Sequence, residues 1–201
     1  MSAKKRSSHE SSKKPSTKPK LKVLSSKLVY DGKVFKICSD KVTEPSGITA
    51  QRDVVHHSGS VVVLAIDESG DEPRVLLERQ YRYAAQDYLW ELPAGRIDSG
   101  EEALAGAKRE LIEETGYRAK KWKRALFFYA SPGFLDETMA IYLARQLTAG
   151  DAQPEEDESI ECRLVPLSQA TDMIFSGKIR DGKTIAGVLW LSEALRRGDL
   201  N

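Results

Sequence analysis

A continuous apolar run near the middle of the chain restricts the fold more than any other feature of the sequence. The run is Ser60–Ile66, with the sequence Ser-Val-Val-Val-Leu-Ala-Ile, and the loop-forming segment Asp67–Pro73 follows it. Such a run is typical of a β-strand that is buried on both faces. The chain has 201 residues and is 40% apolar, so we expect one domain with a substantial core, with or without a small appendage.

Shorter segments with strand or helix character surround this run. The expected strands are, in chain order, Lys27–Tyr30, Lys33–Val42, Ile48–His57, Arg74–Arg79, Trp122–Ala130, Thr138–Arg145 and Ile160–Val165. The expected helices are Gly100–Thr115, Ser168–Phe175 and Thr184–Arg196. Strands outnumber helices and do not alternate regularly with them, so the pattern predicts an α+β fold.

The first residues of the chain differ in composition from the rest. Met1–Lys22 holds seven Lys and one Arg against one Glu, a local charge of +7, so a net charge of +1 leaves −6 for the remainder. The segment is also rich in Ser and Pro, and we expect a disordered basic tail. A salt-sensitive contact with nucleic acid or an acidic partner is the less favoured alternative.

The expected organisation is a tail over residues 1–22, a small antiparallel sheet over 23–58 and the main domain over 59–201. Turn sequences at Asp31-Gly32 and Glu44–Gly47 separate the strands of the small sheet. A sheet of this size is marginally stable alone. It should therefore pack on the main domain, on a second copy of itself, or on both.

Membrane and secreted classes are disfavoured. No apolar run approaches the roughly 18 residues that a spanning helix needs, and Met1–Lys20 lacks the hydrophobic stretch of a signal peptide. The two cysteines, Cys38 and Cys162, lie far apart and match no metal-binding spacing. We expect reduced thiols, a cytoplasmic location and no membrane partner.

The expected helix Gly100–Thr115 carries an unfavourable pattern of charges. Ser99 and Glu102 predict a capping box at its start and Gly116 its end. One face forms a buried stripe, made by Leu104, Ala107, Leu111 and Thr115. The other face gathers like charges near the carboxyl end, where the helix dipole disfavours anions, on Glu110, Glu113 and Glu114. From this pattern alone a solvated acidic face is favoured, and the alternative is a bound Mg²⁺ or Mn²⁺ that compensates the charge.

The residues before and along this helix resemble the Nudix box, G-x5-E-x7-R-E-U-x-E-E-x-G-U, in which U is a bulky aliphatic residue. The matching residues are Gly95, Glu101, Arg109, Glu110, Leu111, Glu113, Glu114 and Gly116, with Tyr117 departing from the pattern at the last U. The resemblance implies the Nudix fold, a mixed sheet sandwiched by helices. It also implies divalent-metal-dependent hydrolysis of a diphosphate linked to another moiety.

The resemblance assigns metal ligands residue by residue. Mg²⁺, with Mn²⁺ as the alternative, is expected on the backbone carbonyl of Ala94, on Glu110 and Glu114, and, shared or through water, on Glu113. Arg109 and Glu101 are expected to orient these glutamates from behind.

Further segments resemble the ADP-ribose pyrophosphatase branch of the family. They are Arg79–Tyr83, Glu91–Gly95, Ser131–Gly133 with Pro132 lying 15 residues after Tyr117, and Ile179–Leu189. The implied reaction converts ADP-ribose to AMP and ribose 5-phosphate. A pyrophosphatase for GDP-mannose or another nucleotide sugar is the first alternative, and a non-catalytic nucleotide-sugar-sensing module is the second. In this branch the small sheet is exchanged across a homodimer.

The same resemblance implies substrate contacts and a catalytic base. The substrate contacts are expected from Tyr30, Arg52, Arg82, Glu91 and Glu137, each of which has an ion-pair or packing role as its alternative. The base is expected in the acidic run Glu155–Glu158, which precedes the last strand. We favour Glu158, then Glu156, as the carboxylate that orients or deprotonates the attacking water, with Glu113 of the box also counted as catalytic.

Overall fold

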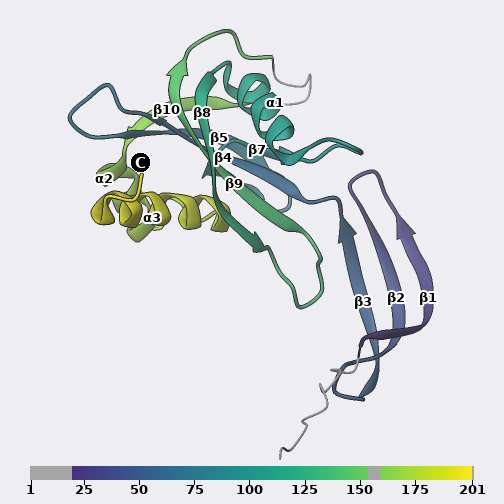
Figure 1. Cartoon of the computed structure of the whole chain (residues 1–201). Helices are drawn as coiled ribbons and strands as arrows, with labels where there is room; N and C mark the ends of the chain where they lie inside the picture. The colour runs from purple at the N-terminus through teal and green to yellow at the C-terminus, as the bar shows by residue number, and fades with distance from the viewer. Residues whose placement is uncertain (1–19, 154–158, 201) are drawn as a thin grey trace, which may run out of the picture.

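The computed structural model describes residues 20–153 and 159–200, which form a main body and a projecting arm (Figure 1). The strands are β1 (Lys22–Asp31), β2 (Phe35–Thr43), β3 (Thr49–His57), β4 (Ser60–Asp67), β5 (Arg74–Arg82), β6 (Asp87–Glu91), β7 (Ala94–Arg96), β8 (Arg118–Tyr129), β9 (Thr138–Thr148) and β10 (Glu161–Pro166). The helices are α1 (Ala103–Thr115), α2 (Leu167–Phe175) and α3 (Gly182–Arg197). In this part of the chain, no helix has the length and apolar character needed to cross a membrane.

The body is built on a mixed sheet with β4 at its centre. The strand order is β10-β5-β4-β9-β8, with β6 paired to β5 and β7 paired to β4. The β4 and β9 strands are parallel, and the other pairs are antiparallel. Every residue from Val61 to Ile66 is completely buried, which confirms the prediction from the apolar run.

Helices cover the two faces of this sheet. Val61, Val63 and Ala65 of β4 pack on the side of α1. Val62, Leu64 and Ile66 pack on the opposite side, with residues of α2 and α3. Figure 1 shows α1 and the pair α2–α3 on opposite sides of the sheet. The predicted α+β class and the sandwiched mixed sheet are therefore confirmed.

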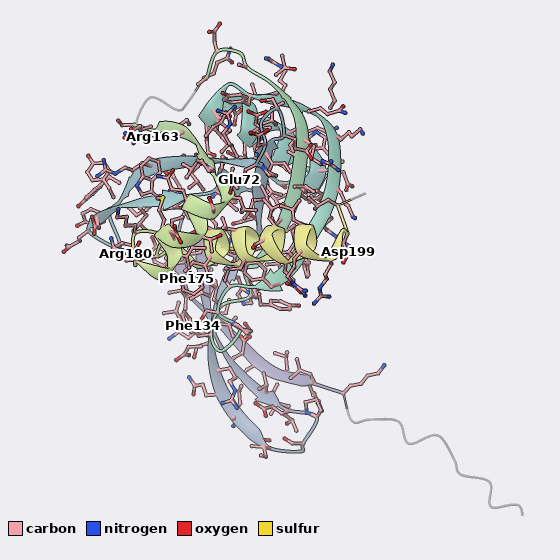
Figure 2. All side chains as sticks on the ribbon, turned by 90° about the vertical axis from the view of Figure 1, so that its left-hand side faces the viewer. Glu72, Phe134, Arg163, Phe175, Arg180 and Asp199 are labelled. Atoms are coloured by element: carbon pink, nitrogen blue, oxygen red, sulfur yellow. The ribbon has the colours of Figure 1, made fainter. Side chains whose placement is uncertain are left out.

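The arm is a three-stranded antiparallel sheet in the order β1-β2-β3. Its backbone joins the body where Val55 of β3 pairs in parallel with Leu135, and Phe134 marks this junction in Figure 2. Asp136 strengthens the joint, because its carboxylate accepts from the backbone N–H of His57 at 2.8 Å and bonds His56 Nδ1 at 2.6 Å. Beyond this joint the sheet projects away from the body.

The predicted boundaries need two corrections. Helix α1 begins at Ala103, and its N-cap Glu102 makes no side-chain capping bond, so the Ser99–Glu102 capping box is wrong. The preceding turn is instead held by Glu101, which accepts from the backbone N–H of Asp98 at 3.1 Å. Strands β6 and β7 were not expected, because they are short and carry no clear alternation. Gly116 ends α1 as predicted, in the left-handed conformation with φ of 74°.

Candidate active site

Two glutamates of α1 turn inward, toward the loop that precedes the helix. Glu110 and Glu114 are only 9% and 5% exposed, so the expectation of one outer acidic face is corrected. Glu110 lies directly over Gly95, where an added Cβ would stand 1.8 Å from Glu110 Oε1. Glu114 accepts a hydrogen bond from the backbone N–H of Ala94 at 3.0 Å. The glycine of the box is therefore needed to make room for a buried carboxylate.

Arg109 connects three acids of the box, namely Glu101, Glu110 and Glu113. Its Nη1 donates to Glu110 at 2.7 Å and to Glu113 at 2.9 Å, while Nε and Nη2 donate to Glu101 at 3.0 and 2.9 Å. The hydrogen bonds to Glu101 contribute most to raising the pKa of Arg109, and they lower the pKa of Glu101 in turn. A guanidinium suits this position because its planar fork serves three carboxylates at once.

These residues line a cavity of about 510 Å³ whose charge is unbalanced. Its charged walls are Asp98, Glu110, Glu113, Glu114 and Glu137 against Arg82, Arg96, Arg109 and Lys183. Three further glutamates contact this set from outside the cavity, namely Glu78, Glu91 and Glu101. Eight carboxyl groups thus meet four cations, and carboxylate oxygens are the donors that hard divalent cations prefer.

No three Asp, Glu, His or Cys side chains within residues 20–153 and 159–200 form a complete cation cage. Arg109 instead engages Glu110 and Glu113. The donor chemistry and the excess of negative charge fit a divalent cation on the predicted ligands. Occupancy would require Glu110 or Glu113 to turn from Arg109 toward the ion.

Two cations of the cavity wall, Arg82 and Lys183, are held by a buried glutamate that lies behind them. Glu91 is 1% exposed and accepts from Arg82 Nε and Nη2 at 2.9 and 3.0 Å. Lys183, at the start of α3, also donates to Glu91. Burial alone would raise the pKa of Glu91, but the bond from Arg82 and the charge of Lys183 together lower it. Arg82 and Glu91 were both singled out from the sequence, whereas Lys183 was missed because its partner lies 92 residues away.

Glu137 lies on the wall nearest the arm. It accepts from Ser60 Oγ at 2.6 Å, and His57 Nδ1 is 3.6 Å from Glu137 Oε1. His57 and Ser60 both line the cavity, although the sequence offered no pattern that marks either one. The structure therefore brings Arg82, Glu91 and Glu137 close to the box.

The other predicted site residues lie elsewhere. Arg52 is on β3 of the arm and pairs with Glu44, and Tyr30 is on β1 with its ring 5.5 Å from that of Phe35. Neither Arg52 nor Tyr30 lines the cavity of its own chain. The predicted base candidates, Glu156 and Glu158, fall outside the described residues.

Glu78 of β5 is a further acid that sequence reasoning missed. It is completely buried, and burial together with the negative charge of Glu91 raises its pKa to about 7. Its carboxyl lies against that of Glu114. In the sequence Glu78 begins the polar stretch Glu78-Arg79-Gln80, so it reads as a solvent-facing residue of the strand. Only the pairing of β5 with its neighbours reveals its position.

Comparison with known proteins agrees with this geometry. The NUDIX domain family matches residues 56–187, about two thirds of the chain and including the whole box. The chain belongs to the Nudix family. It is 37% identical to an ADP-ribose pyrophosphatase of Bacillus subtilis, over 87% of this chain and 95% of the relative. It is 36% identical to an ADP-ribose pyrophosphatase of Mycobacterium tuberculosis, over 83% and 80%.

Other similar proteins carry different names. A methanol dehydrogenase activator of Bacillus methanolicus is 35% identical over 87% of this chain and 95% of the relative. The fold matches a crystal structure of an ADP compounds hydrolase with a TM-score of 0.75 and 20% identity, over 90% of this chain and 97% of that chain. At that identity the likeness concerns the Nudix fold alone.

Proposed function

We propose that this Nudix protein hydrolyses the diphosphate of ADP-ribose to AMP and ribose 5-phosphate. The observation that carries the proposal is the joining, in one cavity, of the α1 glutamates with Arg82 and Lys183. The acids suit a divalent cation and the two cations suit phosphate oxygens. Two relatives named ADP-ribose pyrophosphatase, with coverage of 80% or more of their own length, support ADP-ribose as substrate.

The proposed metal ligands are the carbonyl of Ala94 and the carboxylates of Glu110, Glu114 and Glu113, with Mg²⁺ as the ion. When bound, the ion neutralises diphosphate charge and lowers the pKa of a water molecule. Arg109, braced by Glu101, orients the box glutamates. Arg82 is held by Glu91 on one side, which fixes the direction of its guanidinium and lets the rest of the fork face the substrate.

The attacking water needs a carboxylate to orient it, and we assign this role to Glu158, with Glu156 as the next candidate. Both precede β10, whose first residues pair with β5 beside the cavity wall. Glu137, hydrogen-bonded to Ser60, is the proposed polar contact to the substrate on the side of the arm.

We further propose that the protein is a homodimer in which the arm, residues 23–58, completes the partner's site. The arm exposes large apolar side chains, namely Leu24, Leu28, Val29, Tyr30, Val34, Phe35 and Ile48. Three strands cannot bury such a surface by themselves. Exchange between two copies would cover it, and would carry Arg52 and Tyr30 toward a site that they do not reach within their own chain.

The cysteines bear on the cellular location, and the box glutamates bear on the alternative functions. Free Cys38 and Cys162 agree with a reducing compartment, and we propose the cytoplasm. Neither a GDP-mannose pyrophosphatase nor a sensing module is favoured by a feature of the described residues. Retention of every box glutamate argues for catalysis.

Product analysis tests the proposal. ADP-ribose, GDP-mannose and a nucleoside triphosphate are offered in parallel with Mg²⁺, and Glu114→Gln serves as the site variant. We expect AMP and ribose 5-phosphate, formed fastest from ADP-ribose and nearly abolished by the substitution. Faster turnover of GDP-mannose would support the proposed site but contradict ADP-ribose as the substrate. No turnover of any compound would favour the sensing module.

A further inference from the structure

Glu78 is a buried carboxylate to which none of the roles proposed above has been given. It lies on β5, opposite Glu91 of β6 and Cys162 of β10. Leu76, two residues earlier, belongs to the core on the α1 side of the sheet. Because side chains alternate along a strand, Glu78 also points toward α1. Its completely buried carboxyl therefore lies between the sheet and the carboxyl end of that helix.

The surroundings of Glu78 do not explain it as a core residue. In the part of the chain that the structure describes, no N–H or alcohol O–H group donates a hydrogen bond to either of its oxygens. The nearby cations, Arg82 and Lys183, bond Glu91 instead. Its close neighbour is a second acid, Glu114. Burying a carboxyl without a donor is unfavourable, so an apolar side chain would stabilise the empty fold better.

We propose that Glu78 is a positioning residue of the metal centre, which holds the Glu114 carboxylate toward the cavity and adds negative charge behind it. Glu114 lines the cavity and Glu78 does not, so Glu78 lies behind it. The N–H of Ala94 holds one Glu114 oxygen at 3.0 Å, and Glu78 supports the same carboxyl without competing for that donor. The inference rests on the proposed metal site.

The physical reason is electrostatic. Two adjoining buried carboxyl groups repel when both are charged, and a divalent cation in the cavity relieves this repulsion. The empty protein is therefore less stable because of Glu78, while the metal is bound more tightly. If Glu78 had only a structural role, it would stabilise the metal-free protein, and replacing it would lower that stability.

The test compares metal affinity with the stability of the empty protein. Mn²⁺ alone is titrated into the full chain without substrate, and the free ion is followed by electron paramagnetic resonance. The variants are Glu78→Gln, which keeps the shape, and Glu78→Leu, which removes all polarity. The matched control is Asp71→Asn, the same charge change at an exposed loop residue. We expect both Glu78 variants to bind Mn²⁺ about 10- to 100-fold more weakly, with a metal-free Tm equal to or above that of the parent.

Two results would overturn the inference. One is an affinity for Mn²⁺ within about threefold of the parent in either Glu78 variant, well below the effect of a lost ligand partner. The other is a lower metal-free Tm in both variants, which would make Glu78 a core partner. The Glu114→Gln variant distinguishes an error in the proposed metal site from an error in the proposed role of Glu78. If the Glu114→Gln variant binds Mn²⁺ as tightly as the parent, or if the parent binds none, the proposed metal site is wrong. If Glu114→Gln weakens binding and the Glu78 variants do not, only the proposed role of Glu78 is wrong.

Discussion

The sheets of the body and the arm have similar strand lengths but opposite relations to solvent. In the body, β4 is covered on both faces and Val61–Ile66 are wholly buried. In the arm, every residue of β1 is exposed, including Leu28 and Tyr30. Burial of apolar surface is the main stabilising contribution to folding. The body is therefore stable by its own packing, whereas the arm needs a second surface, which we assign to another copy of the chain.

The largest effect on the body is expected from Gly95→Ala. The added methyl group would occupy the space of the Glu110 carboxylate, so the box glutamates must shift. We expect activity to fall by about 100-fold, because small displacements of catalytic groups have large effects. Steady-state kinetics measure this. Gly133→Ala, whose new methyl meets nothing within 4 Å, is the control. Equal activities in the two variants would contradict the packing of Glu110 on Gly95.

Removing a core side chain tests whether packing within the body supplies its stability. Leu64→Ala on β4 should lower the free energy of unfolding by about 2–5 kcal/mol, because it leaves a cavity between the sheet and α3. Leu189→Ala, on the exposed side of α3, should lower it far less. Urea denaturation measures both. Similar losses would mean that the two positions are equally covered in solution.

One charge in the arm tests its need for a partner. Leu28 is 53% exposed on β1, and Leu28→Glu should prevent association of two copies. Ser46→Glu introduces the same charge at the exposed turn between β2 and β3 and should leave association intact. Sedimentation velocity separates the dimer expected for the parent from the monomer expected for Leu28→Glu. If the parent protein is monomeric at all concentrations, the proposed homodimer is wrong.

The smallest effect concerns the pH dependence of stability. Arg82 and Lys183 lower the pKa of Glu91 below its ordinary value of 4.5. The stability from this group is present above that value and is lost as the pH falls through the lower pKa of the folded state. Glu91→Gln should therefore show a shallower loss of unfolding free energy on acidification than the parent. Urea denaturation across this range measures it, and identical slopes would contradict the lowered pKa.

The sequence predicts those features in which neighbours along the chain also meet in space. The apolar run became the central strand, Gly116 ended α1, and Glu110 and Glu113 pair with Arg109 at i+1 and i+4 spacing. The strand boundaries were right to within a few residues for most strands. The α+β class and the family followed from these local patterns.

The features that were missed depend on contacts between distant residues. Lys183 meets Glu91 only because α3 packs beside β6. Glu78 meets Glu114 because β5 contributes to the sheet face that α1 covers, and a Glu followed by Arg79 and Gln80 carries no local sign of burial. The capping box failed for a related reason, because Glu101 is engaged by Arg109 and the turn before the helix is shaped by that bond. Tertiary partners outweighed local preference at each of these positions.

The joint at Val55 and Leu135 continues along the chain into the wall of the cavity. The segment that contacts β3 includes Asp136, whose carboxylate bonds His56 and His57. The next residue, Glu137, lines the cavity. Residues 135–137 therefore connect the joint of the arm with the hydrogen bond between Glu137 and Ser60 in the cavity wall. The same short segment thus serves both as the attachment of the arm and as part of the cavity wall.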